Sequence, residues 1–332
     1  MGKSELELVL DVLSKAILRE TLSFNYYFKA GKDSSLPDGV RGLLTQLAEE
    51  ERIHRKLLLT EYTSIQKGWS GNDLEGEESG SICYTIPVTP DFIPLAAPDN
   101  LDMKAVSLPA RLVGGDNILA RIVRKRGSAE IGLFVTLYDV MGHSIETTRI
   151  NSMAASVLGE YLDGTFSSEA DEEMLSPAMA VTHLNTQFSN EFEGKGIFLT
   201  LFSAYFDLAR NRIVYTTAGH EPPMLRRKNG KVDTLFNTQL VIGIDSRRKY
   251  EERSIPFDHG DTLCFFSDGI LEAKNPEGDY YGRQRLSDTL SGYRGKSSEE
   301  TLLGILEDLR EFSSGEQMED ELTIAVISCC RT

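Results

Sequence analysis

Strands that are apolar on both faces constrain the fold of this chain most strongly. The clearest is predicted over 198–206 and begins Phe198-Leu199-Thr200-Leu201-Phe202. Further runs rich in Val, Ile, Phe, Tyr and Thr are predicted strands at 131–138, 212–217, 262–266 and 322–328. Strands of this kind belong to a sheet that is covered on both sides. Helical patterns at 150–162, 176–190 and 298–313 supply the cover, so the sequence predicts an α+β layered sandwich.

Two long helices precede this sandwich in the sequence. They are predicted at 5–29 and 40–67, and the turn-rich segment 31–39 joins them into a hairpin. Apolar residues recur at alternating steps of four and three, which places them on one stripe of each helix. These residues are Leu6, Leu10, Leu13, Ile17, Phe24 and Tyr27 on the first helix, and Val40, Leu44, Leu47, Leu58 and Ile65 on the second. One hairpin cannot bury both stripes, so we expect a homodimer that completes a four-helix bundle.

A Gly-rich acidic stretch at 70–80 marks the boundary between the two parts. It predicts a helical hairpin over 1–68, a linker over 69–105 and the sandwich domain over 106–332.

The charge and the apolar content of the chain limit its binding partners and its location in the cell. The chain has 35 Lys and Arg against 51 Asp and Glu, a net charge of -16 that disfavours binding to nucleic acid and to anionic membranes. No run of eighteen or more apolar residues and no signal-peptide pattern occurs, which predicts a cytoplasmic protein. The four cysteines show no C-x-x-C pair, as expected for reduced thiols; they are Cys83, Cys264, Cys329 and Cys330.

Aspartates stand where predicted strands end or begin. Asp139 closes the strand at 131–138, Asp268 follows 262–266 and Asp320 precedes 322–328, while Asp116 follows a Gly-Gly pair. Such carboxylates are the hard oxygen ligands that Mg²⁺ or Mn²⁺ prefers, and two such ions can polarise a phosphoryl group and generate hydroxide. A single Asp-Gly pair is more often a turn, so this interpretation depends on four aspartates in order.

Five ordered blocks resemble the SpoIIE-type branch of the type 2C metal-dependent protein phosphatases. They are Pro109-Ala110-Arg111-Leu112-Val113-Gly114-Gly115-Asp116, Asp139-Val140-Met141-Gly142-His143, Ala218-Gly219-His220-Glu221-Pro222-Pro223, Gly260-Asp261 leading to Ser267-Asp268-Gly269-Ile270-Leu271-Glu272-Ala273, and Asp320-Glu321-Leu322-Thr323. The resemblance covers about 108–328. It implies an αββα sandwich, two Mn²⁺ or Mg²⁺ ions, and hydrolysis of phosphoserine or phosphothreonine on a protein, of the kind that antagonises an anti-sigma factor.

The resemblance also implies roles for individual residues. Asp139 would bridge the two ions with the Val140 carbonyl on one of them, and Asp268 and Asp320 would complete the second ion's ligands. Asp116 would be an outer or accessory ligand. Asp139, Asp268 and Asp320 would thus be the catalytic carboxylates.

Two histidines in these blocks each have two possible interpretations. His143 follows Asp139 closely and is a candidate catalytic residue, the alternative being a position away from the phosphate. For His220 an imidazole that stabilises its loop is favoured over one that touches phosphate.

At four positions the chain departs from the usual family pattern. These are Asn117 in place of an aromatic residue, Met141 in place of a small one, Ser144 in place of Gly, and Glu321 in place of a second Asp. None removes a proposed ligand, so we expect catalysis to persist with altered substrate approach and basal rate.

Polar residues interrupt the apolar stripes of the hairpin. Glu20 lies on the first stripe, and Glu51 and His54 lie on the second with Glu-x-x-His spacing. Buried carboxylates need a partner or a metal. This pattern resembles half of a ferritin-like or rubrerythrin-like di-iron site, which a second copy would complete. A dimerisation hairpin whose polar residues are only hydrogen-bonded is the open alternative.

The leading hypothesis is a phosphatase regulated by a hairpin that senses iron, oxygen or redox state. A catalytically silent, phosphatase-like binding scaffold is the first alternative, and the intact Asp139, Asp268 and Asp320 argue against it. An iron-handling ferritin-like protein is the second, for which the hairpin is too short relative to the sandwich domain.

Overall fold

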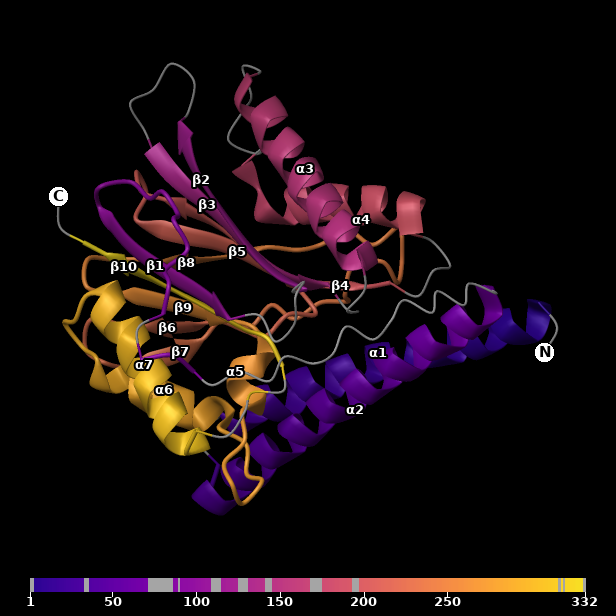
Figure 1. Ribbon diagram of the computed structural model, residues 1–332, viewed down its shortest axis with the longest axis horizontal. Helices are drawn as coiled ribbons and strands as arrows, with labels where there is room; N and C mark the ends of the chain where they lie inside the picture. Colours follow the sequence, from indigo (N-terminus) through magenta and orange to yellow (C-terminus); the bar gives the residue numbers. More distant parts are fainter. Residues whose placement is uncertain are drawn as a thin grey trace.

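Two antiparallel five-stranded sheets packed face to face form the centre of the molecule (Figure 1). The computed structural model describes residues 3–32, 36–70, 86–88, 90–108, 115–124, 131–140, 145–167, 175–192, 197–315, 318 and 320–330. The strands of one sheet, in spatial order, are β1 (Leu101–Leu108), β10 (Leu322–Cys329), β9 (Thr262–Phe266), β6 (Met224–Arg226) and β7 (Val232–Thr234). Those of the other are β2 (Asp116–Arg124), β3 (Ile131–Val140), β4 (Leu199–Asp207), β5 (Arg212–Ala218) and β8 (Arg253–Pro256).

Helices cover the outer face of each sheet. On the second sheet these are α3 (Ile145–Ser167) and α4 (Pro177–Phe192), and on the first they are α6 (Gly282–Gly292) and α7 (Ser298–Ser313), preceded by the short α5 (Asp268–Glu272). The alternation along β4 explains its doubly apolar sequence. Leu199 and Leu201 pack under α3 and α4, whereas Phe202 and Phe206 point into the core between the sheets. The prediction of a layered α+β fold is confirmed.

The first strand lies earlier in the chain than the sequence pattern indicated. The strand β1 begins at Leu101, inside the predicted linker 69–105, and pairs with β10 along its whole length. Its apolar residues alternate with polar ones, and Leu101, Met103 and Ala105 enter the core between the sheets. The first sheet therefore includes residues that precede the predicted domain start at 106.

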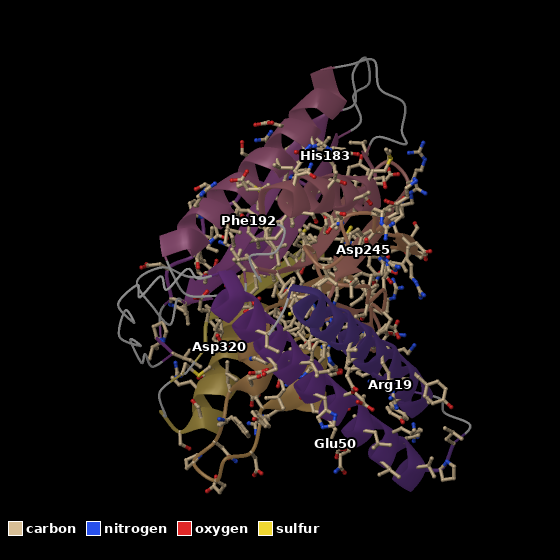
Figure 2. All side chains as sticks on the ribbon, turned by 90° about the vertical axis from the view of Figure 1, so that its right-hand side faces the viewer. Arg19, Glu50, His183, Phe192, Asp245 and Asp320 are labelled. Atoms are coloured by element: carbon tan, nitrogen blue, oxygen red, sulfur yellow. The ribbon has the colours of Figure 1, made fainter. Side chains whose placement is uncertain are left out.

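The two N-terminal helices, α1 (Lys3–Gly31) and α2 (Asp38–Ser70), lie side by side along one flank of the sandwich (Figures 1 and 2). Their contact with it is apolar. Ile17, Leu59 and Tyr62 pack against Phe198 and Val241 of the sandwich. A second contact joins Phe24, Phe28 and Ala48 to Phe236.

This contact changes which face of α2 is buried. The sequence pattern placed His54 on the inner stripe, but its side chain is 58% exposed. The buried face instead carries Ala48, Arg52, Arg55 and Leu59, because α2 packs on the sandwich as well as on α1. Within the described residues no helix is both long enough and apolar enough to span a membrane.

Candidate active site

Four predicted aspartates converge on one pocket at the ends of the central strands. Asp116 opens β2 and pairs directly with Asp139, near the end of β3. Asp268 begins α5 immediately after β9, and Asp320 precedes β10. All four line one pocket together with Val140. The antiparallel register of β2 and β3 and the adjacency of β9 and β10 bring distant parts of the sequence to this edge.

Glu321 holds the backbone of this pocket in place. Its Oε1 and Oε2 accept hydrogen bonds from the backbone amides of Gly115 and Asp116, both at 2.9 Å. The sequence pattern had marked Glu321 only as a departure from the family. Because the contact joins residues about 200 positions apart, nothing local in the sequence indicated it.

Two glycines are required by the close approach of these segments. A Cβ at Gly115 would lie 2.7 Å from both Asp139 Oδ1 and the Val140 carbonyl oxygen. At Gly269 it would lie 1.9 Å from the carbonyl oxygen of Glu321. Any larger residue would displace the carboxylates.

The pocket concentrates negative charge in a buried place. Burial is the main cause that raises the pKa of Asp139 well above its ordinary value, and the neighbouring carboxylates raise it further. Burial also raises the pKa of Asp116 to about 8 and that of Asp268 to about 6, although Lys56 opposes the shift at Asp268. Asp116 Oδ2 is buried without a hydrogen-bond partner in the described part of the chain. Such a cluster is costly without a bound cation.

These residues fit hard divalent ions. The donor set is made of oxygen atoms, as Mg²⁺ and Mn²⁺ prefer. Oxygen atoms of Asp268, Asp320 and Glu272 lie within 4.8 Å of one another. Glu272 thus adds a carboxylate that the sequence pattern had not indicated as a ligand. Glu272 ends α5, four residues after Asp268, so one helical turn brings it back to the pocket.

His220 also lines the pocket. The ring is 3% exposed, with Nδ1 3.0 Å from Thr200 Oγ1 on β4. Burial lowers its pKa to about 4, so the ring is neutral at physiological pH. The geometry agrees with a loop-stabilising imidazole. The other candidate, His143, lies outside the described residues, as do Met141, Ser144 and Cys83.

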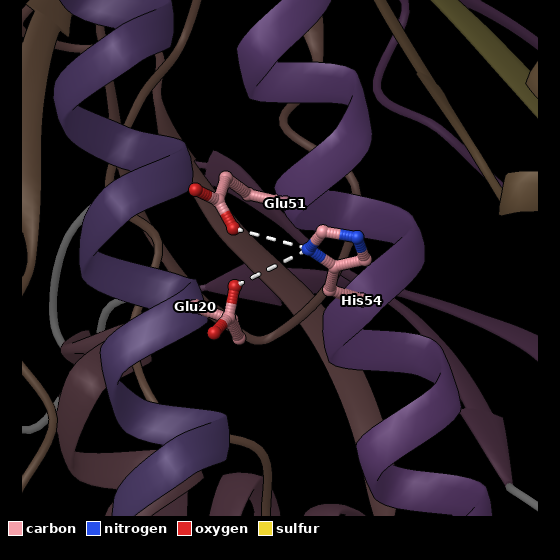
Figure 3. A group of neighbouring side chains, drawn as sticks. All are labelled: Glu20, Glu51 and His54. Atoms are coloured by element: carbon pink, nitrogen blue, oxygen red, sulfur yellow. Dashed lines mark ion pairs between the residues drawn. The ribbon is translucent and has the colours of Figure 1, made fainter.

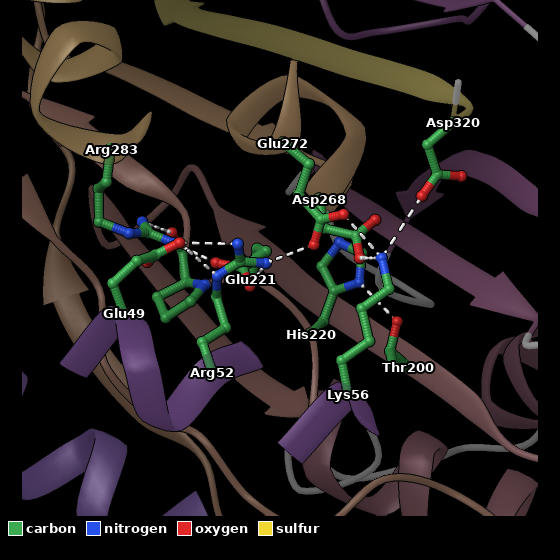
Figure 4. Close-up of polar contacts among 11 residues, drawn as sticks. Glu49, Arg52, Lys56, Thr200, His220, Glu221, Asp268, Glu272, Arg283 and Asp320 are labelled. Atoms are coloured by element: carbon green, nitrogen blue, oxygen red, sulfur yellow. Dashed lines mark hydrogen bonds and ion pairs between the residues drawn. The ribbon is translucent and has the colours of Figure 1, made fainter. Parts of the chain in front are cut away.

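The helix α2 closes one side of the same pocket with cationic side chains (Figure 4). Lys56 Nζ lies 2.7 Å from Glu272 Oε2 and 3.5 Å from Oδ2 of both Asp268 and Asp320. Arg52 Nη1 donates to Glu272 Oε1 at 2.8 Å. The sequence pattern indicated no functional role for Arg52 or Lys56, because more than 200 positions separate them from Glu272.

A second buried ion pair anchors α2 beside the pocket. Glu221 pairs with Arg283, and Arg52 Nη1 lies 3.9 Å from its Oε1. Burial alone would raise the pKa of Glu221, but Arg283 and Arg52 hold it below its ordinary value. Glu221 is therefore ionised, and it ties the hairpin to the sandwich.

The three hairpin residues also come together (Figure 3). His54 Nδ1 lies 3.5 Å from Glu51 Oε2 and 3.7 Å from Glu20 Oε2. A hydrogen bond with Glu51, followed by burial, raises the pKa of Glu20. Ligand atoms of the three residues lie within 4.8 Å of one another, as a metal site requires.

Comparison with models of protein families identifies the family of this chain. The family model described as Stage II sporulation protein E (SpoIIE) matches residues 130–329. The chain belongs to this family. The predicted SpoIIE-type phosphatase domain is confirmed, and the match covers β3 through β10 with Asp139, Asp268 and Asp320.

Two curated relatives share this region. Phosphoserine phosphatase RsbU of Bacillus subtilis is 24% identical over 230 residues, which cover 68% of this chain and 63% of the relative. Protein IcfG of Synechocystis sp. is 26% identical over 220 residues, which cover 60% of this chain and 34% of the relative. The chain thus spans less than two thirds of the length of either relative.

A solved structure shows the same fold. The SiaA-PP2C domain of Pseudomonas aeruginosa superposes with a TM-score of 0.58 at 17% identity, covering 68% of this chain and 85% of that domain. The two-sheet architecture is therefore that of the PP2C phosphatases.

Proposed function

We propose that this chain hydrolyses phosphoserine or phosphothreonine on a protein, in a metal-dependent reaction. The observation that carries the proposal is the convergence of Asp116, Asp139, Asp268 and Asp320 in one pocket. Membership of the SpoIIE family and similarity to a protein named phosphoserine phosphatase support it.

The pocket residues have distinct proposed roles. Asp139 would be shared by two Mn²⁺ or Mg²⁺ ions, Val140 would offer its carbonyl oxygen, Asp268 and Asp320 would hold the second ion, and Asp116 would be an accessory ligand; all five residues line the pocket. When bound, such ions supply positive charge to the phosphoryl oxygens and lower the pKa of water. His143 is kept as a proposed catalytic residue.

The chain's own contribution is positioning. Glu321 fixes the backbone that carries Asp116, and the glycines at 115 and 269 let the strand ends approach. Neutral His220 joins β4 to the segment after β5 through Thr200. A preorganised site of this kind needs little rearrangement in the transition state.

The proposed substrate is a phosphorylated antagonist of an anti-sigma factor in the cytoplasm. The resemblance of the five sequence blocks to SpoIIE-type phosphatases, which implies such a substrate, supports this class of partner. The acidic net charge of -16 disfavours nucleic acid as an alternative partner.

The test is phosphate release from matched phosphopeptides. With Mn²⁺ or Mg²⁺ the full chain should release phosphate from phosphoserine and phosphothreonine peptides, slowly or not at all from the phosphotyrosine peptide, and not in the presence of EDTA. Release that persists after complete chelation of divalent ions would refute the metal-dependent mechanism.

For the hairpin we propose a dimeric, ferritin-like module that holds a pair of iron atoms and regulates the phosphatase. Glu20, Glu51 and His54 supply half of the ligands, and a second copy supplies the rest. Large apolar side chains stay exposed on the hairpin, namely Val12, Tyr26, Leu43 and Leu57. Covering them by a second hairpin would remove this apolar surface from water.

Sedimentation of the full chain tests the dimer. Wild type should sediment as a dimer and a Leu57→Glu variant as a monomer, because the charge would lie in the proposed interface. A monomeric wild type at high micromolar concentration would rule out this role for the hairpin.

A further inference from the structure

Lys56 occupies an unusual place for a helix-surface lysine. It belongs to α2 of the hairpin, yet its ammonium lies between carboxylates of the sandwich domain (Figure 4). Two of these, Asp268 and Asp320, are the residues proposed to hold the second divalent ion. The third, Glu272, is the closest, at 2.7 Å.

The ammonium remains charged in this position. Burial would lower the pKa of Lys56, but Asp268, Glu272 and Asp320 together raise it above its ordinary value. Lys56 Nζ lies within 3.5 Å of an oxygen atom of each of the three carboxylates. One positive charge thus offsets part of the repulsion among three carboxylates.

The neighbouring contacts hold Lys56 there. Arg52, one turn earlier on α2, is 4% exposed and bonds Glu272 and Glu49. Leu59, almost one turn later, packs in an apolar cluster with Phe198 and Val241. The helix is therefore fixed on both sides of Lys56.

The same helix restricts access to the pocket. Arg52, Arg55, Lys56 and Leu59 all line it together with Asp116 and Asp139. A phosphorylated side chain of a folded protein has to reach these aspartates past α2.

We propose that Lys56 is a tethered cation that competes with the second divalent ion for Asp268 and Asp320, so that docking of α2 and binding of that ion oppose each other. This inference depends on the proposed metal-dependent function. The docked hairpin is then an autoinhibitory element, and whatever lifts α2 from the pocket raises both metal affinity and access for substrate.

The competition follows from charge and space. An ion held by both Asp268 and Asp320 would lie where Lys56 Nζ now balances them, and like charges at such distances repel strongly in a partly buried site. If the Lys56 ammonium moved to contact Glu272 alone, its repulsion with the ion would fall only a little. An oxygen atom of Glu272 lies within 4.8 Å of oxygen atoms of the other two carboxylates. By thermodynamic linkage, binding of the ion must weaken α2 docking by the same free energy by which α2 docking weakens binding of the ion.

Calorimetric titration of metal-depleted full chain with Mn²⁺ tests this. Lys56→Met should tighten binding of the weaker ion by roughly 5- to 150-fold, the usual range of coupling between two sites. Lys56→Arg keeps the charge and should stay close to wild type. Lys104→Met is the matched control, since Lys104 also pairs with a carboxylate, Glu299, at 2.9 Å but lies outside the pocket.

Hydrogen exchange provides a readout that does not depend on activity. Saturating Mn²⁺ should speed hydrogen exchange of the α2 amides around residues 52–59 in wild type. The control variant Lys104→Met should show the same response. Equal Mn²⁺ affinity in wild type and Lys56→Met, or slower α2 exchange with Mn²⁺, would overturn the proposal.

Phosphate release by the same variants distinguishes failure of the proposed phosphatase function from failure of the proposed role of Lys56. If all variants bind Mn²⁺ and none releases phosphate, the proposed phosphatase function fails. The Mn²⁺ affinities of wild type and Lys56→Met still show whether Lys56 competes with the ion. If Lys56→Met lowers turnover at saturating Mn²⁺ with unchanged affinity, Lys56 aids catalysis and the inhibitory role is refuted.

Discussion

Two clusters of acidic side chains, one in the sandwich pocket and one on the hairpin, differ in how the chain builds them. In the pocket, Asp116 and Asp139 are set by strand register, and Glu321 ties the backbone of Asp116 in place. On the hairpin, Glu20 and His54 project from helix surfaces, and the histidine side chain is 58% exposed.

The difference shows what each cluster requires. Buried like charges have few ways to relax, and the pocket therefore needs cations from metal ions or from Lys56. On the hairpin the His54 side chain is exposed to water, and a hydrogen bond between Glu20 and Glu51 raises the pKa of Glu20. A cation is required in the first cluster and optional in the second.

The largest effect is expected from Asp139→Asn. Removing the central carboxylate should lower phosphate release by roughly 10³-fold or more, because the ions lose their shared ligand. Steady-state phosphate release measures it. Asp288→Asn on the exposed face of α6 is the control and should keep wild-type turnover. Comparable rates in the two variants would mean that the pocket is not the catalytic centre.

The next effect concerns the ion pairs that dock α2. Arg52→Met should lower the free energy of unfolding by about 3 kcal/mol, because it leaves buried carboxylates with less compensation. Arg41→Met removes a pair with Asp38, whose side chain is 92% exposed, and should cost less than about 1 kcal/mol. Urea denaturation compares the two variants. A similar loss in both would show that the α2 contact contributes no more than a surface pair.

A smaller effect is expected from Gly269→Ala. Its Cβ would meet the Glu321 carbonyl oxygen at 1.9 Å, so the strand ends must separate, at a cost of about 1–3 kcal/mol and with loss of turnover. Gly292→Ala has open space and should be neutral or slightly stabilising. Thermal denaturation and phosphate release follow both variants. A fully active Gly269→Ala enzyme would show that the close approach is dispensable.

The smallest effect on stability is expected at the hairpin cluster. A Glu51→Gln, His54→Ala double variant should change the free energy of unfolding by less than about 1 kcal/mol, because His54 is 58% exposed and glutamine can keep the hydrogen bond of Glu51 with Glu20. Under the di-iron proposal it should nevertheless lose iron after anaerobic purification, as measured by elemental analysis. Equal iron content in the variant and wild type would dismiss the di-iron proposal.

The sequence predicted the layered fold and the convergence of four aspartates at strand ends from local patterns, and the four aspartates do line one pocket. The predicted limits 262–266 and 298–313 coincide with β9 and α7, because Thr262–Phe266 is wholly buried and Ser297 begins α7 with a capping box. Short or half-polar strands such as β6 and β1 carry weak local patterns, and their pairing depends on distant partners.

What the sequence did not indicate is how the hairpin meets the pocket. No sequence pattern singled out Arg52 or Lys56, and only the tertiary structure brings Glu272 to them. Glu321 was likewise read as a deviation, although its carboxylate bonds two backbone amides of the site. Long-range contacts of this kind leave no periodic signal in one sequence.

Equilibrium dialysis against Mn²⁺ tests the central claim, that the pocket is the divalent-metal centre, most directly. The Glu51→Gln, His54→Ala variant removes the hairpin ligands and should still bind two Mn²⁺ per chain. Adding Asp139→Asn to it should reduce the bound Mn²⁺ to less than one per chain. Unchanged occupancy after loss of Asp139 would contradict the assignment of the pocket as the metal centre.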